Sequence, residues 1–227
     1  EKCNVIQLYN HRPESLRPFE DQVETTTELS LLKEADVYII CLKDDVIEDV
    51  ASQIKTTSGI IAHTSGSQSI LNGENAAVFY PLQTFSKHSE LNYSEIPFCL
   101  EANSNEHLDV LKDLAYSISS KVYEISSAQR QTLHLAAVFV CNFTNHLYAI
   151  GEHICEKDNI PFDILKALIK ETSEKVQKLS PTDVQTGPAV RKDETTIKRH
   201  LTQLQDQTHL DIYQLLTQSI IQKHDKL

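Results

Sequence analysis

The sequence contains few glycines and no methionine. Only five of its 227 residues are glycine, and no two lie close enough to form the glycine-rich turn that usually holds a pyrophosphate at a helix N-terminus. Methionine is absent even at position 1. A chain of this length is expected to contain several, so either the chain begins inside its gene product or methionine residues were not written out.

The charge balance and the cysteines exclude further classes of protein. The formal net charge is −11, whereas a nucleic-acid-binding protein usually presents a basic face. No uninterrupted apolar run approaches the roughly 20 residues that cross a bilayer, and no signal-peptide pattern opens the chain. The five cysteines form no Cys-x-x-Cys pair. We therefore expect a cytoplasmic protein with buried free thiols, no metal site, and no membrane or nucleic-acid partner.

What the sequence does contain begins as an alternation of strands and helices. Three β-rich runs cover residues 3–10, 35–42 and 59–67, and helical patterns follow the first two at residues 13–23 and 44–54. The run ADVYIICL is continuously apolar, as expected for a parallel strand that is covered on both faces. This order predicts a doubly wound α/β domain.

The second part of the sequence is helical. A less regular stretch at 76–102 is followed by a helix near 104–119 and a short strand at 121–125, after which the β pattern ends. The expected helices beyond it lie near residues 128–157, 161–179, 193–205 and 209–224. We therefore place a domain boundary near Ser126, with an α/β domain at residues 1–126 and an all-α domain at residues 127–227.

Polar residues follow three of the strands, and ligands of a doubly wound sheet bind beyond the carboxyl ends of its strands. The first strand ends in Arg12, where an NAD enzyme usually has an acidic residue that binds the ribose 2′-hydroxyl. An arginine there suits the 2′-phosphate of NADP, although Arg12 could equally cap a surface turn. The candidate cofactor contacts are Asn10, His11, Arg12, Leu42, Lys43, Thr64, Ser65 and Gly66. Because the glycine-rich turn is absent, either the first strand, turn and helix precede the given sequence, or a dinucleotide binds here in another way.

The segment HLAAVFVCNFTNHLYAI (134–150) reads as a buried helix, yet it contains an imidazole and two carboxamides. At 100° per residue, His134 and Asn145 fall within about 60° of each other, and Asn142 lies beside them. The two asparagines are only about 4.5 Å apart along the helix axis and could share one small ligand, whereas His134 is about 16 Å from Asn145. His134 is the candidate proton donor, because imidazole titrates near neutral pH. The alternative is a satisfied buried network or a subunit contact.

A second polar cluster lies in the turn VQTGPAVRKD (184–193). Gln185, Thr186 and the backbone around Gly187 offer donors and acceptors, and Arg191 can hold a carboxylate or a phosphate through two hydrogen bonds. The alternative is a plain connection between helices in which Asp193 caps the next helix. Both interpretations can hold together.

Five segments together carry a resemblance to a known family: HTSGS, VFYPLQTFSK, IPFCLEA, LHLAAVFVCNFTNHLY and QTGPAVRKD, in this order. They resemble the Rossmann-like NADP oxidoreductases of unassigned substrate whose helical C-terminal half is classed as a domain of unknown function. The resemblance covers nearly all of the chain, and the family is distantly similar to pyrroline-5-carboxylate reductases and β-hydroxyacid dehydrogenases.

The resemblance implies an NADP-binding Rossmann-like domain, a helical domain that dimerises, and an active cleft between them. Its members begin with a strand and a glycine-rich turn, which favours truncation of the given sequence. The β-hydroxyacid dehydrogenases carry a Lys-x-x-x-Asn pair on the corresponding helix. Here Val138 and Cys141 lie four residues before Asn142 and Asn145, so that mechanism is not carried over.

The sequence thus predicts an NADP-dependent oxidoreductase that acts as a homodimer on a small polar, anionic metabolite. His134 is expected to be the general acid or base, with Asn142 and Asn145 orienting the substrate. The candidate substrate-binding residues are Gln83, Gln185, Thr186 and Arg191. A rival hypothesis, favoured by the missing lysine, is a nucleotide- or metabolite-binding protein without turnover. A third, a purely structural dimer module, leaves QTGPAVR without a role.

Overall fold

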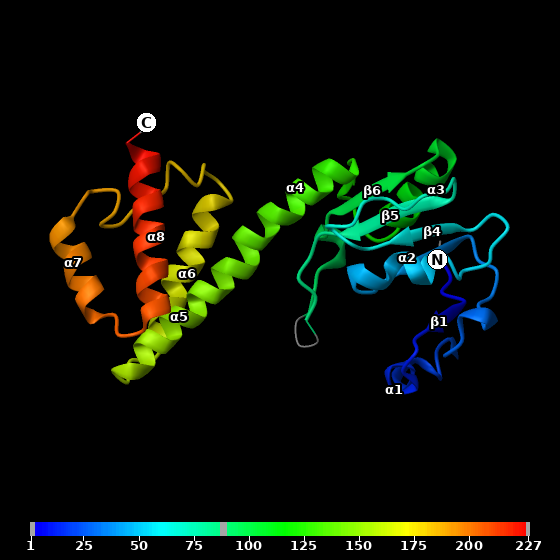
Figure 1. The fold of residues 1–227 in the computed structure, drawn as a ribbon, viewed down its shortest axis with the longest axis horizontal. Helices are drawn as coiled ribbons and strands as arrows, with labels where there is room; N and C mark the ends of the chain where they lie inside the picture. Colours follow the sequence, from blue (N-terminus) through cyan, green and yellow to red (C-terminus); the bar gives the residue numbers. More distant parts are fainter. Residues whose placement is uncertain (1–2, 87–89, 226–227) are drawn as a thin grey trace. The chain divides into compact units, whose positions relative to one another are not determined.

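The computed structural model describes residues 3–86 and 90–225, and the chain divides into two compact units. The first unit ends at Asn142 and the second begins at Phe143. The first holds the strands and the second holds only helices (Figure 1). The sequence predicts a domain boundary near Ser126, where the β pattern ends, and that assignment stays a prediction.

The first unit is built on a five-stranded sheet with the order β3-β4-β5-β6-β7. Its strands are β3 (Val37–Ile40), β4 (Ile60–His63), β5 (Ala76–Pro81), β6 (Phe98–Ala102) and β7 (Val122–Glu124). Neighbouring strands run parallel except for β5 and β6, which are antiparallel. The Rossmann-like prediction is confirmed, with one antiparallel pairing that the sequence pattern did not predict. In the described residues between β5 and β6 there is only a 3₁₀ turn, and antiparallel strands need no crossover helix.

The core of this unit lies on both faces of the sheet. Every residue of β4 is buried, which explains why this segment is apolar without alternation. On one face, helix α3 (Asn105–Tyr116) buries Leu108, Leu111 and Ala115 against the sheet. These residues recur at helical spacing, and each leucine contributes about 1.5–3 kcal/mol by its burial. A second cluster joins β3 to Ile47 at the start of the short helix α2 (Ile47–Ala51).

The N-terminal elements form a separate, small sheet. Strand β1 (Gln7–Tyr9) pairs in parallel with β2 (Glu24–Thr26), and α1 (Pro13–Leu16) and a 3₁₀ turn lie between them. The strand expected at residues 3–10 is shorter because only three of its residues pair with β2. The sequence analysis missed β2, whose three residues carry no hydrophobic alternation.

The first unit leads into a continuous helix from Ser127 to Lys157. It consists of α4 (Ser127–Ala137), a π-helical segment (Val138–Phe143) and α5 (Thr144–Lys157) (Figure 1). A capping box between Ser126 and Gln129 fixes its start. The π-helical segment contradicts the assumption of 100° per residue across this stretch. The angular grouping expected for His134 and Asn145 on an ideal helix therefore does not apply.

The same helix is long and apolar enough, by length and composition only, to cross a membrane, with a window of mean hydropathy 1.2. Polar residues interrupt the apolar positions of this helix, so the sequence contains no long uninterrupted apolar run and did not predict this property. One such helix is weak evidence for a membrane span, since helices of water-soluble proteins pass the same test. A long exposed apolar surface of this kind nevertheless marks a site of contact with other apolar groups.

The second unit contains α5, α6 (Asp163–Val176), α7 (Glu194–Gln203) and α8 (Gln207–His224). Asp193 and Asp206 cap α7 and α8 by accepting hydrogen bonds from the backbone amides of Thr196 and His209. Among the described residues of this unit, only Ala189 is buried. Large apolar side chains are exposed instead, including Ile164 at 67%, Leu168 at 62% and Leu215 at 67%. Several large apolar side chains of this unit are therefore in contact with solvent in the described chain.

All five cysteines are free, as expected, but only Cys99 is buried. The expectation of buried thiols is wrong for Cys3, Cys41 and Cys141, which are exposed. Cys3 precedes the start of β1 at Gln7, and Cys141 lies on the exposed π-helical segment.

Candidate functional site

Many hydrogen bonds converge on the loop after β4, residues 64–69, which we call the β4 loop. His63, the last residue of β4, is fully buried and holds both ends of this loop. Its Nδ1 accepts a hydrogen bond from the Ser65 amide (3.1 Å), so Nε2 carries the proton and donates to the Ser69 carbonyl (3.1 Å). Burial lowers the pKa of His63, and the imidazole is held neutral as a structural brace.

A buried ion pair fixes the same loop to α4. The Arg130 side chain is fully buried and forms an ion pair with Glu101 at the end of β6. Its other terminal nitrogen donates to the Gln68 carbonyl (2.5 Å) and to the Ser127 hydroxyl (3.2 Å). Gln131 adds a bond from its amide to the Ser67 carbonyl (2.9 Å). The first turns of α4 therefore hold the β4 loop in one conformation.

One turn further along α4, His134 meets β5 and the β4 loop. Its Nδ1 lies 3.2 Å from the hydroxyl oxygen of Tyr80, and the two rings are edge-on, with centroids 6.2 Å apart. Gly66 lies directly against both rings, since a Cβ there would be 2.5 Å from His134 Nδ1 and 2.8 Å from Tyr80 Cζ. A side chain at position 66 would occupy the space of the imidazole, so this glycine is required by packing.

An acidic residue completes the cluster. Asp44 follows β3, accepts a hydrogen bond from the Ser67 hydroxyl, and receives the Gln68 side-chain amide on its backbone carbonyl (3.0 Å). Burial raises the pKa of Asp44, but hydrogen bonds from Ser67 and Ser65 and the nearby His134 and His63 lower it more, and the net shift is downward. A carboxylate, an imidazole and a phenol thus converge beyond the carboxyl ends of β3, β4 and β5.

The predicted cofactor residues divide into exposed and internal groups. Arg12 is exposed, and its guanidinium has no hydrogen-bond or ion-pair partner among the described residues. Its backbone amide binds the Asn10 side chain (2.9 Å), which shapes the turn after β1. Lys43 and His11 are also exposed, and Leu42 packs against the cluster around β3. An exposed, unpaired guanidinium is suited to a phosphate, so this part of the chain fits the NADP prediction.

Thr64, Ser65 and Gly66 are used largely within the protein. Thr64 bonds to the Ile40 carbonyl, and the Ser65 hydroxyl accepts the amides of Ser67 and Gln68 (3.1 and 3.0 Å). Gly66 is covered by His134 and Tyr80. Their predicted cofactor contacts stay predictions, and the structure adds a second role for them in shaping the β4 loop.

The other predicted substrate residues are exposed. Asn142 lies in the π-helical segment and Asn145 in α5, and no hydrogen bond joins either carboxamide to another described residue. Gln83, after β5, accepts hydrogen bonds from Thr84 at its side-chain oxygen. No hydrogen bond joins Asn142 or Gln83 to His134, and the predicted roles of all three residues stay predictions.

The predicted turn at residues 184–193 belongs to the second unit. Gly187 has φ +112°, which a residue with a side chain rarely adopts. Gln185, Thr186 and Arg191 are exposed, and the Gln185 side chain donates to the Thr186 carbonyl (3.2 Å). Asp193 is the N-cap of α7, which confirms the structural interpretation of this turn. The predicted ligand-binding role remains a prediction.

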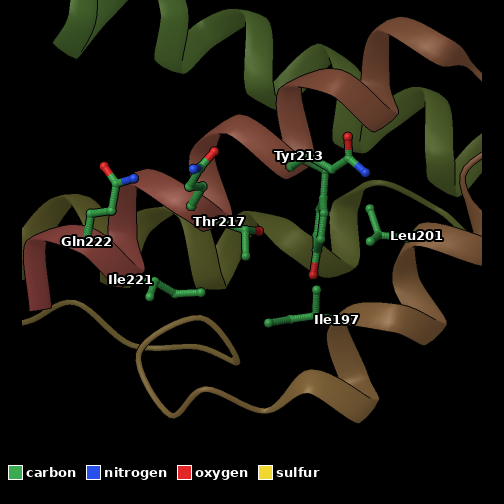
Figure 2. Close-up of a pocket in the computed structure, with 8 residues that line it drawn as sticks. Ile197, Leu201, Tyr213, Thr217, Ile221 and Gln222 are labelled. Carbon is green, nitrogen blue, oxygen red and sulfur yellow. The ribbon is translucent and has the colours of Figure 1, made fainter. Parts of the chain in front are cut away.

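The second unit also contains a groove of ≈ 360 Å³ between α7 and α8. Ile197 and Leu201 line it from α7, while α8 contributes Tyr213 and several amide and apolar side chains (Figure 2). The Tyr213 hydroxyl is 2.8 Å from Nδ1 of His200. No carboxylate or cation is among the residues that line this groove, so it offers no charged group to bind an ionic ligand.

Five residues of this region were not predicted from the sequence: Tyr80, Asp44, His63, Glu101 and Arg130. A histidine inside the apolar run GIIAH and an arginine near the start of an apolar helix were available signals, because buried polar groups need partners. Tyr80 gave no such signal, since a tyrosine in a strand is ordinary. Tyr80 meets His134 only in the folded chain, where β5 pairs with β4 and the end of β5 contacts α4.

The chain is similar to one protein family and to several solved structures. Residues 96–220 match a family model described as Domain of unknown function (DUF2520). Among curated protein sequences, none matches the chain significantly. The crystal structure of a protein named a putative NADP oxidoreductase from Bacteroides fragilis is 41% identical, with a TM-score of 0.89, over 96% of this chain and 89% of that one.

Two more distant structures share the fold. An imine reductase from Myxococcus stipitatus in complex with NADP⁺ has a TM-score of 0.61 at 12% identity, over 97% of this chain and 84% of that one. A 1-pyrroline-5-carboxylate reductase from Streptococcus pyogenes has a TM-score of 0.55 at 15% identity, over 97% of this chain and 89% of that one. The predicted resemblance is thereby confirmed.

Proposed function

Because the chain belongs to the family described as Domain of unknown function (DUF2520) and has a Rossmann-like fold, we propose that it is an NADP-dependent oxidoreductase acting on a small polar, anionic metabolite. The observation that carries this proposal is the half-buried imidazole of His134 at the carboxyl ends of the strands. One edge of the ring is held by Tyr80, and Nε2 has no hydrogen-bond partner among the described residues. That nitrogen is available to a ligand.

NADP is the cofactor that the fold and the relatives support. The relative that is 41% identical is named for NADP, and the exposed guanidinium of Arg12 offers two donors to a 2′-phosphate. Lys43 provides a second exposed cation after β3. When bound, the nicotinamide supplies the hydride chemistry, while the protein orients the substrate and handles the proton.

His134 is the proposed general acid or base. The imidazole lies near enough to the Asp44 carboxylate to interact with it electrostatically, and this interaction is one of the causes that lower the pKa of Asp44. The β4 loop is held by His63, Arg130 and Gln131, so the surface beside His134 is rigid before a ligand arrives. Such rigidity avoids the cost of ordering the site when the substrate binds.

Substrate orientation is proposed for the exposed amides and the arginine predicted from the sequence. Asn142, Asn145, Gln83, Gln185 and Thr186 can donate and accept hydrogen bonds, and Arg191 can bind a carboxylate bidentately. The anionic character of the proposed substrate rests on this arginine. We also propose a homodimer, because α5, α6 and α8 expose large apolar side chains that a second copy could cover. The location proposed for the protein is the cytoplasm, as expected from the sequence.

The alternative is a metabolite-binding protein of the same fold without turnover. It is favoured by the absence of the Lys-x-x-x-Asn pair, which leaves His134 as the candidate acid on this helix. A screen of keto acids, imines and aldehydes with NADPH separates the two. NADPH consumption that depends on one class of substrate supports the enzyme, and binding of NADPH without consumption by any class supports the alternative.

The cofactor assignment is tested by calorimetry on the full-length protein. Tighter binding of NADPH than of NADH is expected, and Arg12→Ala should weaken NADPH about 10- to 100-fold while leaving NADH nearly unchanged, as for a charge-assisted hydrogen bond. Arg17→Ala is a matched control, since Arg17 is another exposed arginine of the same segment. Equal or tighter binding of NADH would contradict the assignment.

A further inference from the structure

Tyr80, on β5, was not among the site residues predicted from the sequence. Its hydroxyl oxygen lies 3.2 Å from Nδ1 of His134, and its ring is buried in the cluster formed by Val78, Cys99 and neighbouring side chains. Gly66 lies beside this contact, so close that an added Cβ would be 2.5 Å from Nδ1 of His134. The phenol is therefore fixed by the core, and the imidazole is fixed by the phenol.

The direction of the hydrogen bond between Tyr80 and His134 follows from the hydroxyl hydrogen of Tyr80, which requires an acceptor. A hydroxyl hydrogen in a buried position needs an acceptor, and the described residues offer the Tyr80 hydroxyl no hydrogen-bond partner except His134. Burial raises the pKa of Tyr80, so the phenol keeps its proton at neutral pH. Tyr80 then donates, and Nδ1 of a neutral His134 accepts.

We propose that Tyr80 is the positioning residue of the site: it holds neutral His134 in the tautomer whose proton is on Nε2, and so presents an N–H donor to the ligand. This inference rests on the proposed function for its role in catalysis. The tautomer itself does not depend on turnover. In the protonated ring the bond reverses, with Nδ1 donating to the tyrosine oxygen, so the imidazole keeps its orientation in both states.

The charged and titratable groups around this pair are few. Asp44 approaches from the segment after β3 and His63 from the end of β4, while Arg130 and Cys141 come from the helix and Cys99 from β6. Arg130 is neutralised by Glu101, and His63 is braced within the β4 loop. Tyr80 is thus the group that directly contacts a ring nitrogen of His134 by hydrogen bonding.

The direct test is nitrogen-15 NMR of the full-length protein with labelled histidine, with the His134 signals assigned by their loss in His134→Gln. The expected result for the wild type is an unprotonated Nδ1 and a protonated Nε2 in the neutral ring. Tyr80→Phe should convert this to a mixture of both tautomers. A protonated Nδ1 in the neutral wild-type ring would overturn the proposal. Because this measurement needs only the wild-type protein, it decides the question even if Tyr80→Phe fails to fold.

The kinetic arm asks whether the tautomer matters for the reaction. With an active substrate, Tyr80→Phe should lower kcat about tenfold, the equivalent of one net hydrogen bond, and alter the pH profile with little change in NADPH affinity. Tyr123→Phe removes an exposed hydroxyl on β7 and should match the wild type. An unchanged kcat and pH profile in Tyr80→Phe would refute the positioning role. If no substrate is turned over, the proposed function fails while the NMR arm still decides the tautomer.

Discussion

A methyl group added at Gly66 provides a sharp test of the packing between the β4 loop, Tyr80 and His134. The new Cβ would lie 2.5 Å from His134 Nδ1 and 2.8 Å from Tyr80 Cζ, and both distances are shorter than any normal contact. Tyr80 is only 9% exposed and cannot easily move, so the imidazole or the loop must shift. Overpacking of this kind costs about 1–3 kcal/mol.

Gly66→Ala should therefore lower the melting temperature by roughly 2–12 °C, at about 2–4 °C per kcal/mol for a chain of this size. Gly151→Ala is the control. It lies in helix α5 with nothing within 4 Å of an added Cβ, and the same change should stabilise that helix by about 0.5–1 kcal/mol. Calorimetry or circular dichroism measures both. A Gly66→Ala protein that melts like the wild type and keeps the His134 tautomer would refute the reasoning.

Three other predictions follow from the same structure. The pKa of His63 is lower in the folded than in the unfolded chain, so unfolding takes up a proton once the pH falls below about 6.5. The free energy of unfolding should therefore decline as the pH falls below this value. Melting temperatures measured between pH 7 and 5 should show a smaller decline in His63→Gln than in the wild type. Glu101→Gln leaves the buried Arg130 unpaired and should cost about 3–5 kcal/mol in a urea titration, whereas Glu95→Gln, in the exposed pair with Lys121, should change little. Light scattering at micromolar concentration should give the mass of a dimer. Leu168→Glu places a charge among the exposed apolar side chains of the second unit and should shift the mass toward that of the monomer. A monomer mass for the wild type would contradict the proposal that a second copy covers these side chains.

The fold was largely predictable from the sequence because its signals are local. Continuous apolar runs marked the buried strands, and long apolar periodicity marked the helices that follow Ser126. The antiparallel pairing of β5 and β6 was not predictable, since it depends on the path of the chain between two similar apolar runs. The π-helical segment was not predictable either, because hydrophobic periodicity does not distinguish a short π-helical turn from the α-helix around it.

The candidate site was predictable in part. His134 was noticeable because it lies in an otherwise apolar helix. Arg12 was noticeable because an NAD enzyme usually has an acidic residue at that strand end. Tyr80, Asp44 and Gly66 required the tertiary structure, because they come from three separate segments that meet only when the sheet forms. Gly66 shows the difference most clearly: the sequence suggested a cofactor contact, and the structure gives a packing reason for the glycine.

The most direct test of the account compares turnover with thermal stability in His134→Gln. If His134 handles the proton of the reaction, the variant should keep a melting temperature close to that of the wild type while NADPH-dependent turnover falls about 10²-fold or more, the usual size of a general acid–base contribution. If the imidazole is only a packing group between Tyr80 and Gly66, the variant should lose stability and keep its specific activity per folded molecule. The second result would contradict the central claim.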